Sequence, residues 1–481
     1  MTRSPGRRWA PGISHLSAVA VAVATMILFM AIVGRAIAMG TTMSFMISVA
    51  VVSLVVVAFR PFVGFYACYA LLLLAPFSDQ RIDLPIFRSP LQALALITVG
   101  AAMARFPLSG RHIYKSRVYL PLAVVVVIFL AESIVGHGAA SETRFYNLVA
   151  GMWPLALVVL LVETPRQARN VLVGLAATCV ALTILWLPGL LALSESKSGI
   201  LGDQLRTGVK IGYAGNPAAV SLLGAVGTLS VQTLVALALV VPVLLGVGVS
   251  SRKGRVWALI GYTAISATIF TATIASAVAT LLVGTATVVF LIILRPSPDV
   301  WTKSRGIAYA LMVVTAITVY GLATVPGHRA FERLTDPKND LSGEVRIISL
   351  QQGWHAFLEQ PWIGQGATDI YRYTPDGWAL AGHNTWGVMA YEYGLIALVP
   401  FAWLLVAIGD ELIRVLRSSR TALDTGVSAG VLASFVAAVV TGFLTPTWAE
   451  VFQDTILWTF IGLAIVWNNW RASDPDAALV A

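Results

Sequence analysis

The sequence predicts an all-α fold, a polytopic helical membrane protein with about 12–14 transmembrane helices and one long extracytoplasmic loop that contains amphipathic helices. Of the 481 residues, 58% are hydrophobic and only 11% are charged, which is far from the composition of soluble domains. Apolar runs of about 18 residues or more recur along most of the chain. Because the runs are continuous rather than alternating, they favour helices over a barrel.

The first apolar run, 16–33, follows Arg3, Arg7 and Arg8 and could be read as a secretory signal. Its length and the many later runs favour an uncleaved first span. Further runs lie at 41–59, 62–77, 90–106, 118–135, 146–162, 170–193, 217–248, 256–273, 276–294, 306–325, 384–408, 427–445 and 453–470. The runs at 62–77 and 90–106 are the weakest, and 217–248 is long enough to include an interfacial piece.

The basic residues predict the orientation of the chain in the membrane. With the N-terminus inside, most of the 32 Lys and Arg fall on the cytoplasmic side, as the positive-inside rule requires. Both termini are then cytoplasmic, and the segments 194–216 and 326–383 are extracytoplasmic. The net charge of +9 is explained by this topology, and no soluble basic domain is present to bind nucleic acid.

The chain therefore divides into N-terminal helices (1–193), a central region with the two extracytoplasmic loops (194–408), and C-terminal helices with a short tail (409–481). Inside the longer loop, the stretch GEVRIISLQQGWHAFLEQP predicts an amphipathic helix. Its apolar positions are Ile347, Leu350, Trp354, Phe357 and Leu358. We expect this helix to lie against the membrane surface or to cap the bundle.

His383 lies where the long loop enters the span at 384–408. A lone histidine near a membrane surface is often only an interfacial residue, but imidazole at such a mouth can also accept a proton near neutral pH. Asn384 could cap the new helix, and Trp386 is placed to anchor it at the interface.

Glu392 and two arginines complete the set of candidate groups. On a straight helix Glu392 is half a turn out of phase with His383 and about 13 Å deeper, so we interpret it as a buried supporting acid. Arg206 and Arg346 lie on the same predicted side as His383. Guanidinium groups suit phosphate oxygens and could offset the charge that develops on a diphosphate leaving group.

Several kinds of site are not indicated by the sequence. There is no GxxxxGK[ST] phosphate loop and no cluster of Asp and His with metal spacing. Cys68 and Cys179 both fall inside apolar runs, so they predict neither a disulfide nor a thiolate metal site. An enzymatic site in this chain should therefore be extracytoplasmic, without a metal or another cofactor.

Three segments together resemble the O-antigen ligase and polymerase family of integral-membrane glycosyltransferases, which is GT-C-like. The first carries Arg206, Gly208 and Asn216, and the second carries Arg346 and Trp354 followed by PWIGQG at 361–366. The third opens a span with His383 and Asn384, followed by Glu392 and Gly394. The resemblance covers roughly 200–400. One departure is at Ser276, which is followed by alanine where the family often has Ser-Arg-Gly.

The resemblance implies a reaction and a location. A glycan carried on undecaprenyl diphosphate would pass to a hydroxyl of a glycan, lipid or protein acceptor, with inversion, at the extracytoplasmic face of a bacterial plasma membrane. His383 would be the general base, and Arg206 and Arg346 would hold the diphosphate. Asn216, Asn384, Glu392 and Trp354 would support the site.

Two other readings remain open. A transporter or flippase of lipid-linked sugars or another solute would carry charged groups near the midplane of several helices, whereas most charges here lie at the ends of the predicted spans. A membrane scaffold without chemistry would tolerate loss of the His383 side chain. Ligase and polymerase cannot be separated from one chain, because both share these motifs.

Overall fold

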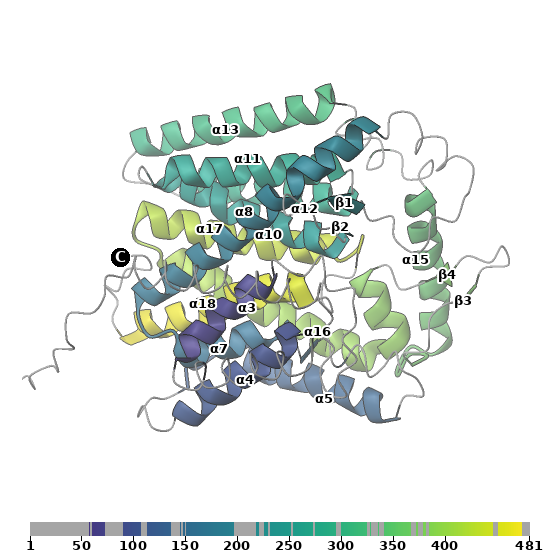
Figure 1. The fold of residues 1–481 in the computed structure, drawn as a ribbon. Coiled ribbons are helices and arrows are strands. Elements are labelled where there is room, and N and C mark those ends of the chain that lie inside the picture. Colours follow the sequence, from purple (N-terminus) through teal and green to yellow (C-terminus); the bar gives the residue numbers. More distant parts are fainter. Residues whose placement is uncertain are drawn as a thin grey trace, which may run out of the picture.

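The computed structural model describes residues 57, 60–72, 90–106, 113–135, 145, 148–149, 151–196, 218–220, 226–228, 231–251, 254–272, 275–294, 300–324, 328, 335, 341–366, 372–373, 379–380, 384–445 and 451–473. Most of these residues form helices that run alongside one another in a bundle, with one helix crossing its end (Figure 1). The predicted all-α polytopic fold is confirmed.

The helices of the bundle follow the apolar runs of the sequence closely. They are α3 (Pro61–Leu72), α4 (Pro90–Arg105), α5 (Tyr119–Val135), α7 (Trp153–Leu161), α8 (Pro165–Ser196), α10 (Val231–Ser250), α11 (Arg255–Ala272), α12 (Ala275–Leu294), α13 (Val300–Ala323), α16 (Thr385–Ser418), α17 (Ala422–Thr441) and α18 (Val451–Ser473). The predicted run 16–33 lies outside the described residues, and so does almost all of 41–59.

Among the residues that the structure describes, five helices are long and apolar enough to cross a membrane. These spans are Pro165–Leu185, Thr233–Ser250, Ala275–Leu294, Thr385–Ser418 and Ala422–Thr441. Shorter apolar helices at 61–72, 94–105, 119–134 and 307–323 accompany them. The protein is thus a multi-pass membrane protein in a lipid bilayer.

Two short antiparallel strand pairs lie beside the helices. β1 (Ala218–Val220) pairs with β2 (Val226–Thr228), and β3 (Arg372–Tyr373) pairs with β4 (Ala379–Leu380). The first pair precedes α10, which begins only at Val231. The predicted run at 217–248 therefore contains a single span preceded by a piece that is not helical throughout.

Helix α10 lies at the centre of the bundle, and 89% of its apolar span Thr233–Ser250 is buried. It packs against α17 with unusually short backbone separation: a Cβ on Gly246 would lie 2.0 Å from the carbonyl oxygen of Gly426. One turn further along α17, a Cβ on Gly430 would lie 2.5 Å from Cα of Val243. Small residues at spacing four allow helices to approach in this way inside a membrane.

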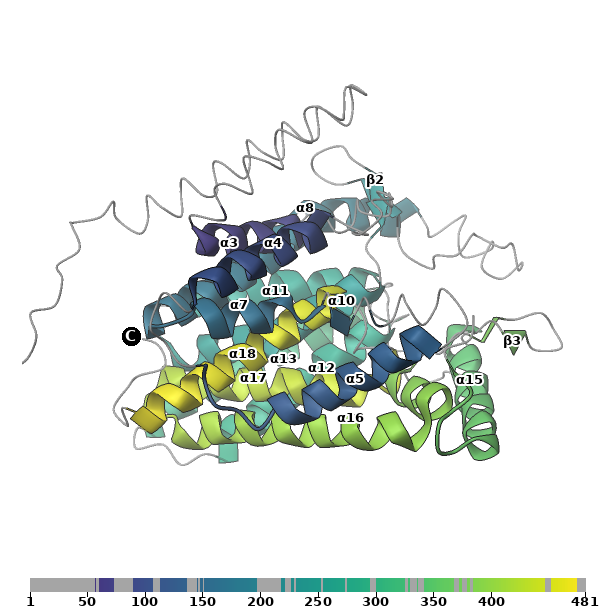
Figure 2. The same ribbon diagram turned by 90° about the horizontal axis from the view of Figure 1, so that it is seen from below.

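The remaining helix, α15 (Leu341–Glu359), lies across the end of the bundle (Figures 1 and 2). The strands β1 to β4 and the beginning of α16 lie at this same end, here called the α15 end. The C-terminal ends of α16 and α18 and the beginning of α5 lie at the opposite end. The two loops predicted to be extracytoplasmic thus connect helices at one end of the molecule.

Candidate functional site

The candidate site lies at the α15 end, around the first turns of α16. Arg206, Asn216 and His383 lie outside the described residues. Arg346 is a helical residue of α15, but its side chain is not among those described. The structure therefore places the backbone of Arg346 and the side chains of Asn384, Glu392 and Trp354.

Asn384 caps α16, as the sequence predicts. Its backbone is extended (φ −146°, ψ 146°), and its side-chain oxygen accepts a hydrogen bond from the backbone N–H of Gly387. The side chain is 3% exposed. The next residue, Thr385, donates its backbone N–H to the carbonyl of Gly442 at 2.7 Å, which ties the start of α16 to the end of α17. Residue 383 is therefore attached to a rigid helix start.

The half-buried side chain of Trp386 packs against the end of α17, and its anchoring at the membrane interface stays a prediction. Its indole N–H donates to the carbonyl of Val439 on α17 at 3.3 Å. Its ring stacks on Phe443 and meets Phe401 edge-on, with centroid separations of 5.3 and 5.8 Å. The side chain thus joins α16 to α17 within the bundle, where aromatic contacts and a satisfied N–H stabilise the pair.

Helix α16 is broken at Gly394, two residues after Glu392. Gly394 has φ 64° and ψ −163°, a conformation that interrupts the helical hydrogen-bond ladder. A break of this kind leaves nearby carbonyls and N–H groups without helical partners, and in a membrane protein these must be satisfied from elsewhere. The break lies beyond Glu392, so the stretch from Thr385 to Glu392, on which the predicted phase and depth of Glu392 depend, is helical.

The segment Pro361–Gly366, here called the docking turn, supplies the missing partners. The backbone N–H groups of Gln365 and Gly366 donate to the carbonyls of Tyr391 and Glu392, at 2.8 and 2.9 Å. In the other direction, Leu395 donates to the carbonyl of Pro361 at 2.8 Å. Ile396 donates to the carbonyl of Trp362 at 3.1 Å. Four backbone hydrogen bonds thus join two motifs that the sequence shows only as separate patterns.

Glycine is required on both sides of this contact. Gly364 has φ 68°, and a Cβ there would lie 2.3 Å from the carbonyl oxygen of Glu392. A Cβ on Gly394 would lie 2.5 Å from the backbone nitrogen of Gly364. Both residues adopt positive φ and touch backbone atoms, so any side chain would strain the chain and push the docking turn away.

The docking turn is also tied to α15. The side-chain amide of Gln365 donates to Glu359 at 2.7 Å and to the carbonyl of Ala356 at 3.2 Å. Further along α15, a Cβ on Gly353 would lie 3.2 Å from the ring of Tyr391. Helix α15, the docking turn and the first part of α16 therefore form one connected unit, with Arg346 on its helix.

Besides Glu359, two more carboxylates lie within or beside this unit. Glu392 is fully buried, in agreement with the sequence interpretation. Glu132 on α5 approaches the docking turn: a Cβ on Gly366 would lie 3.3 Å from its Oε1. One turn before Glu132, the ring of Phe129 stacks on Tyr393 with centroids 4.5 Å apart. Glu132 was not among the candidate residues predicted from the sequence, although an acidic residue inside the apolar run 118–135 often marks a functional or paired position.

Trp354 points away from the break in α16. Its side chain is 58% exposed, and its ring lies 5.5 Å from that of Phe357 on the same helix. Among the described residues, no three His, Cys, Asp or Glu are grouped so that they could hold a metal ion.

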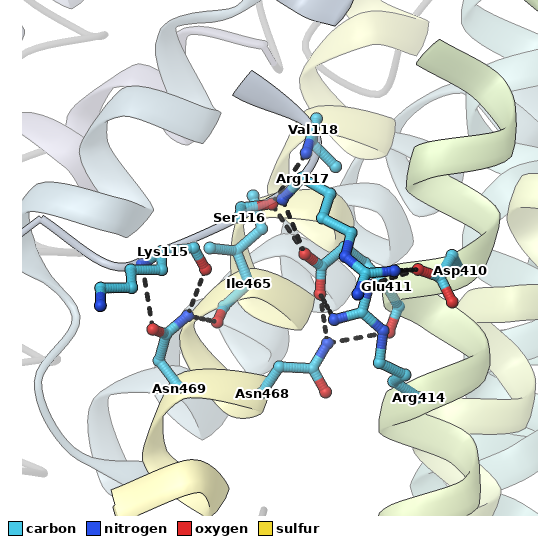
Figure 3. A network of polar contacts seen from close by, with 10 residues as sticks. All are labelled: Lys115, Ser116, Arg117, Val118, Asp410, Glu411, Arg414, Ile465, Asn468 and Asn469. Carbon is cyan, nitrogen blue, oxygen red and sulfur yellow. Dashed lines mark hydrogen bonds and ion pairs between the residues drawn. The ribbon is translucent and has the colours of Figure 1, made fainter. Parts of the chain in front are cut away.

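A second polar cluster lies at the opposite end of the bundle (Figure 3). Glu411 of α16 accepts hydrogen bonds from the Ser116 hydroxyl at 2.8 Å and from the Asn468 amide at 2.5 Å. Asn469 of α18 exchanges two hydrogen bonds with the backbone of Lys115, at 3.0 and 2.8 Å.

Glu411 is 2% exposed, and its hydrogen bonds join three parts of the chain that are distant in sequence. At its edge Asp410 pairs with Arg117 and Arg414, and all three side chains are more than a third exposed. Ion pairs of this kind contribute little to stability. The cluster therefore holds the beginning of α5 to the C-terminal ends of α16 and α18, and the α15 end remains the candidate site.

No protein-family model matches the chain, and no curated protein matches it either. The residues and their geometry are therefore the basis for a functional proposal.

Proposed function

We propose that this protein is an integral-membrane glycosyltransferase of the O-antigen ligase or polymerase type. It would move a glycan from undecaprenyl diphosphate to an acceptor hydroxyl at the extracytoplasmic face of a bacterial plasma membrane. The observation that carries the proposal is the docking turn on the break in α16. The motifs PWIGQG and Glu-x-Gly are separate parts of the family resemblance, and backbone hydrogen bonds join them into one unit at this turn.

This unit gives the proposed groups a common support. His383 directly precedes Asn384, whose cap and attachment to α17 define where α16 begins. Arg346 belongs to α15, which is held to α16 by the contact between Gly353 and Tyr391. A rigid support of this kind is what catalysis by positioning requires.

The chemistry of the proposed step balances without a cofactor. In its neutral form, the imidazole of His383 accepts the proton of the acceptor hydroxyl. The hydroxyl oxygen attacks the anomeric carbon from the face opposite the diphosphate, so the configuration inverts. The bond between the anomeric carbon and the diphosphate oxygen breaks, and its electron pair leaves with the isoprenoid diphosphate. Arg206 and Arg346 stabilise the charge that develops there.

The test is complementation of a strain that lacks this chain. His383→Ala should abolish the surface glycan and cause lipid-linked precursor to accumulate, and Arg346→Lys should reduce transfer because one ammonium cannot replace a bidentate guanidinium. His355→Ala is the matched control, because His355 is an exposed histidine on α15 at the same end. Normal glycan from both His383→Ala and Arg346→Lys, at wild-type protein levels, would refute the assignment.

A transporter or flippase of lipid-linked sugars is the second candidate. The broken helix with a buried carboxylate at Glu392 favours it, because transporters build binding sites from interrupted helices. The side on which precursor accumulates separates the two candidates. Loss of a transferase leaves the lipid-linked glycan on the outer face, open to an added glycosidase. Loss of a flippase leaves it inside, protected until the membrane is permeabilised.

A further inference from the structure

Helix α15 leaves an apolar stripe uncovered at the end of the bundle. Leu350, Trp354 and Leu358 recur at spacing four and are 41%, 58% and 56% exposed. The face that packs towards α16 carries instead the small residues Gly353 and Ala356, which are buried. Three large apolar side chains of this helix are thus exposed, whereas Phe357 is half-buried.

The same surface continues into the docking turn. Trp362 and Ile363, its two large apolar side chains, are 72% and 67% exposed. The backbone of the turn is hydrogen-bonded to α16 on both sides of the break, so these side chains are presented from a fixed frame. Soluble surfaces rarely expose a contiguous apolar patch of this kind without a partner.

The outward face of α16 shows what covers this patch. Ile396, Val399 and Trp403 recur at helical spacing and are about half exposed on a helix that is long and apolar enough to cross a membrane. Such a stripe faces lipid. It begins at Ile396, whose backbone N–H donates to the carbonyl of Trp362. The docking turn, with its exposed apolar side chains, therefore lies beside the beginning of this stripe of α16.

We infer that the side chains of Leu350, Trp354, Leu358, Trp362 and Ile363, here called the α15 apolar surface, lie in the lipid interface at the α15 end. A helix that lies in the plane of the membrane buries its apolar face roughly 5–10 Å into the boundary between headgroups and acyl chains. Tryptophan is favoured at this depth because its ring is apolar and its N–H is polar. Helix α15 crosses the bundle as such a helix does (Figures 1 and 2).

Contact between the α15 apolar surface and lipid holds the docking turn at the level of the lipid headgroups. Arg346 precedes Leu350 by one helical turn, so the backbone of this proposed phosphate-binding residue lies next to the α15 apolar surface. A lipid-linked diphosphate would present its charge at the same depth. The lipid contact of the α15 apolar surface does not depend on the proposed reaction, because it requires only apolar side chains that meet lipid.

Spin-label accessibility in lipid nanodiscs tests the inference. Single labels are introduced by Trp354→Cys, Leu358→Cys and Trp362→Cys. Native Cys68 and Cys179 are fully buried, and the protein without an added cysteine serves as the blank. His355→Cys on α15 and Gln360→Cys directly after it are the aqueous controls, because both residues are exposed and polar and lie off the face of Leu350, Trp354 and Leu358. Val399→Cys is the lipid reference, since Val399 is 60% exposed on α16.

Labels at positions 354, 358 and 362 should collide with oxygen in preference to a water-soluble nickel complex. Their ratio of oxygen to nickel collisions should be several-fold above that of the two aqueous controls and should approach that of position 399. A ratio equal to the aqueous controls would overturn the inference. So would immobile labels that neither reagent reaches, and dipolar broadening would then identify a second copy of the chain as the partner.

An independent measurement uses the protein without labels. Trp354→Phe and Trp362→Phe should each remove part of the tryptophan fluorescence that brominated lipids quench. If neither change reduces the quenched fraction, both indoles lie outside the lipid, and the inference fails.

Discussion

Replacing Gly394 by alanine should open the connection between the docking turn and α16. The new methyl group would lie 2.5 Å from the backbone nitrogen of Gly364 and 2.6 Å from the carbonyl carbon of Trp362. Both are backbone atoms, so no flexible side chain can move aside to admit it. The docking turn must shift as a whole, and the hydrogen bonds that join it to α16 must lengthen or break.

The expected loss of free energy follows from the backbone conformation of Gly394 and from the hydrogen bonds on either side of the contact. At φ 64° and ψ −163° Gly394 occupies a region that is nearly restricted to glycine, which costs another residue about 1–3 kcal/mol. The hydrogen bonds from Leu395 and Ile396 flank the contact, and each contributes about 1 kcal/mol. We therefore expect a loss of about 3 kcal/mol in the free energy that closes the docking turn on α16. This corresponds to about a 100-fold increase in the open population.

Hydrogen exchange measured by mass spectrometry reports this opening directly. Exchange should accelerate in peptides that cover 361–366 and 391–396, which contain the bonded amides. Gly409→Ala is the matched control in the same helix, because its Cβ would meet only the ring of Phe435 at an ordinary 3.6 Å. In the control, exchange should be unchanged or slightly slower, since alanine favours a helix interior.

The reasoning is refuted if Gly394→Ala and Gly409→Ala show the same protection in both peptides. Such a result would mean that the docking turn does not satisfy the broken helix in the way the four hydrogen bonds indicate.

Three further outcomes are expected. Gly430→Val should lower the midpoint of thermal unfolding, measured by size-exclusion chromatography after heating, because its Cβ would lie 2.5 Å from Cα of Val243; an unchanged midpoint would contradict the tight α10–α17 contact. Glu411→Leu should lower the free energy of unfolding by about 3 kcal/mol and Glu411→Gln by less, because leucine removes both acceptors from the half-buried donors of Ser116 and Asn468. A lower thermal midpoint for Glu411→Gln than for Glu411→Leu would be evidence against the cluster. Asn384→Ala should lower the free energy of unfolding by about 1 kcal/mol and speed amide exchange in the first turn of α16, whereas Asn384→Asp should retain the cap. Equal exchange in both variants would argue against the capping hydrogen bond.

Much of the fold could be predicted from the sequence because it depends on local properties. Apolar runs of sufficient length must become helices in lipid, where every backbone polar group needs an internal partner. The helices from α3 to α18 follow these runs for that reason. The cap at Asn384 is equally local, because a short polar side chain next to the start of an apolar run is enough to specify it.

The arrangement around the candidate site could not be predicted in the same way. Trp386 packs against Val439 of α17 and Phe443 just after that helix, and the sequence around Trp386 predicts neither contact. Glu132 was missed because its relation to Gly366 depends on how α5 lies against the docking turn.

The sequence by itself determined that the chain is a multi-pass membrane protein, roughly where its helices run, and where the polar groups at their ends lie. Hydropathy and helical spacing are properties of neighbouring residues, and no distant contact is needed to read them. Only the tertiary structure decided that α16 breaks at Gly394 and that the docking turn repairs the break. It also decided that α15 meets α16 through small residues and leaves Leu350, Trp354 and Leu358 exposed. These features depend on hydrogen bonds and close packing between segments separated along the chain, and the motifs that carry Gly364 and Gly394 do not show from sequence that they meet.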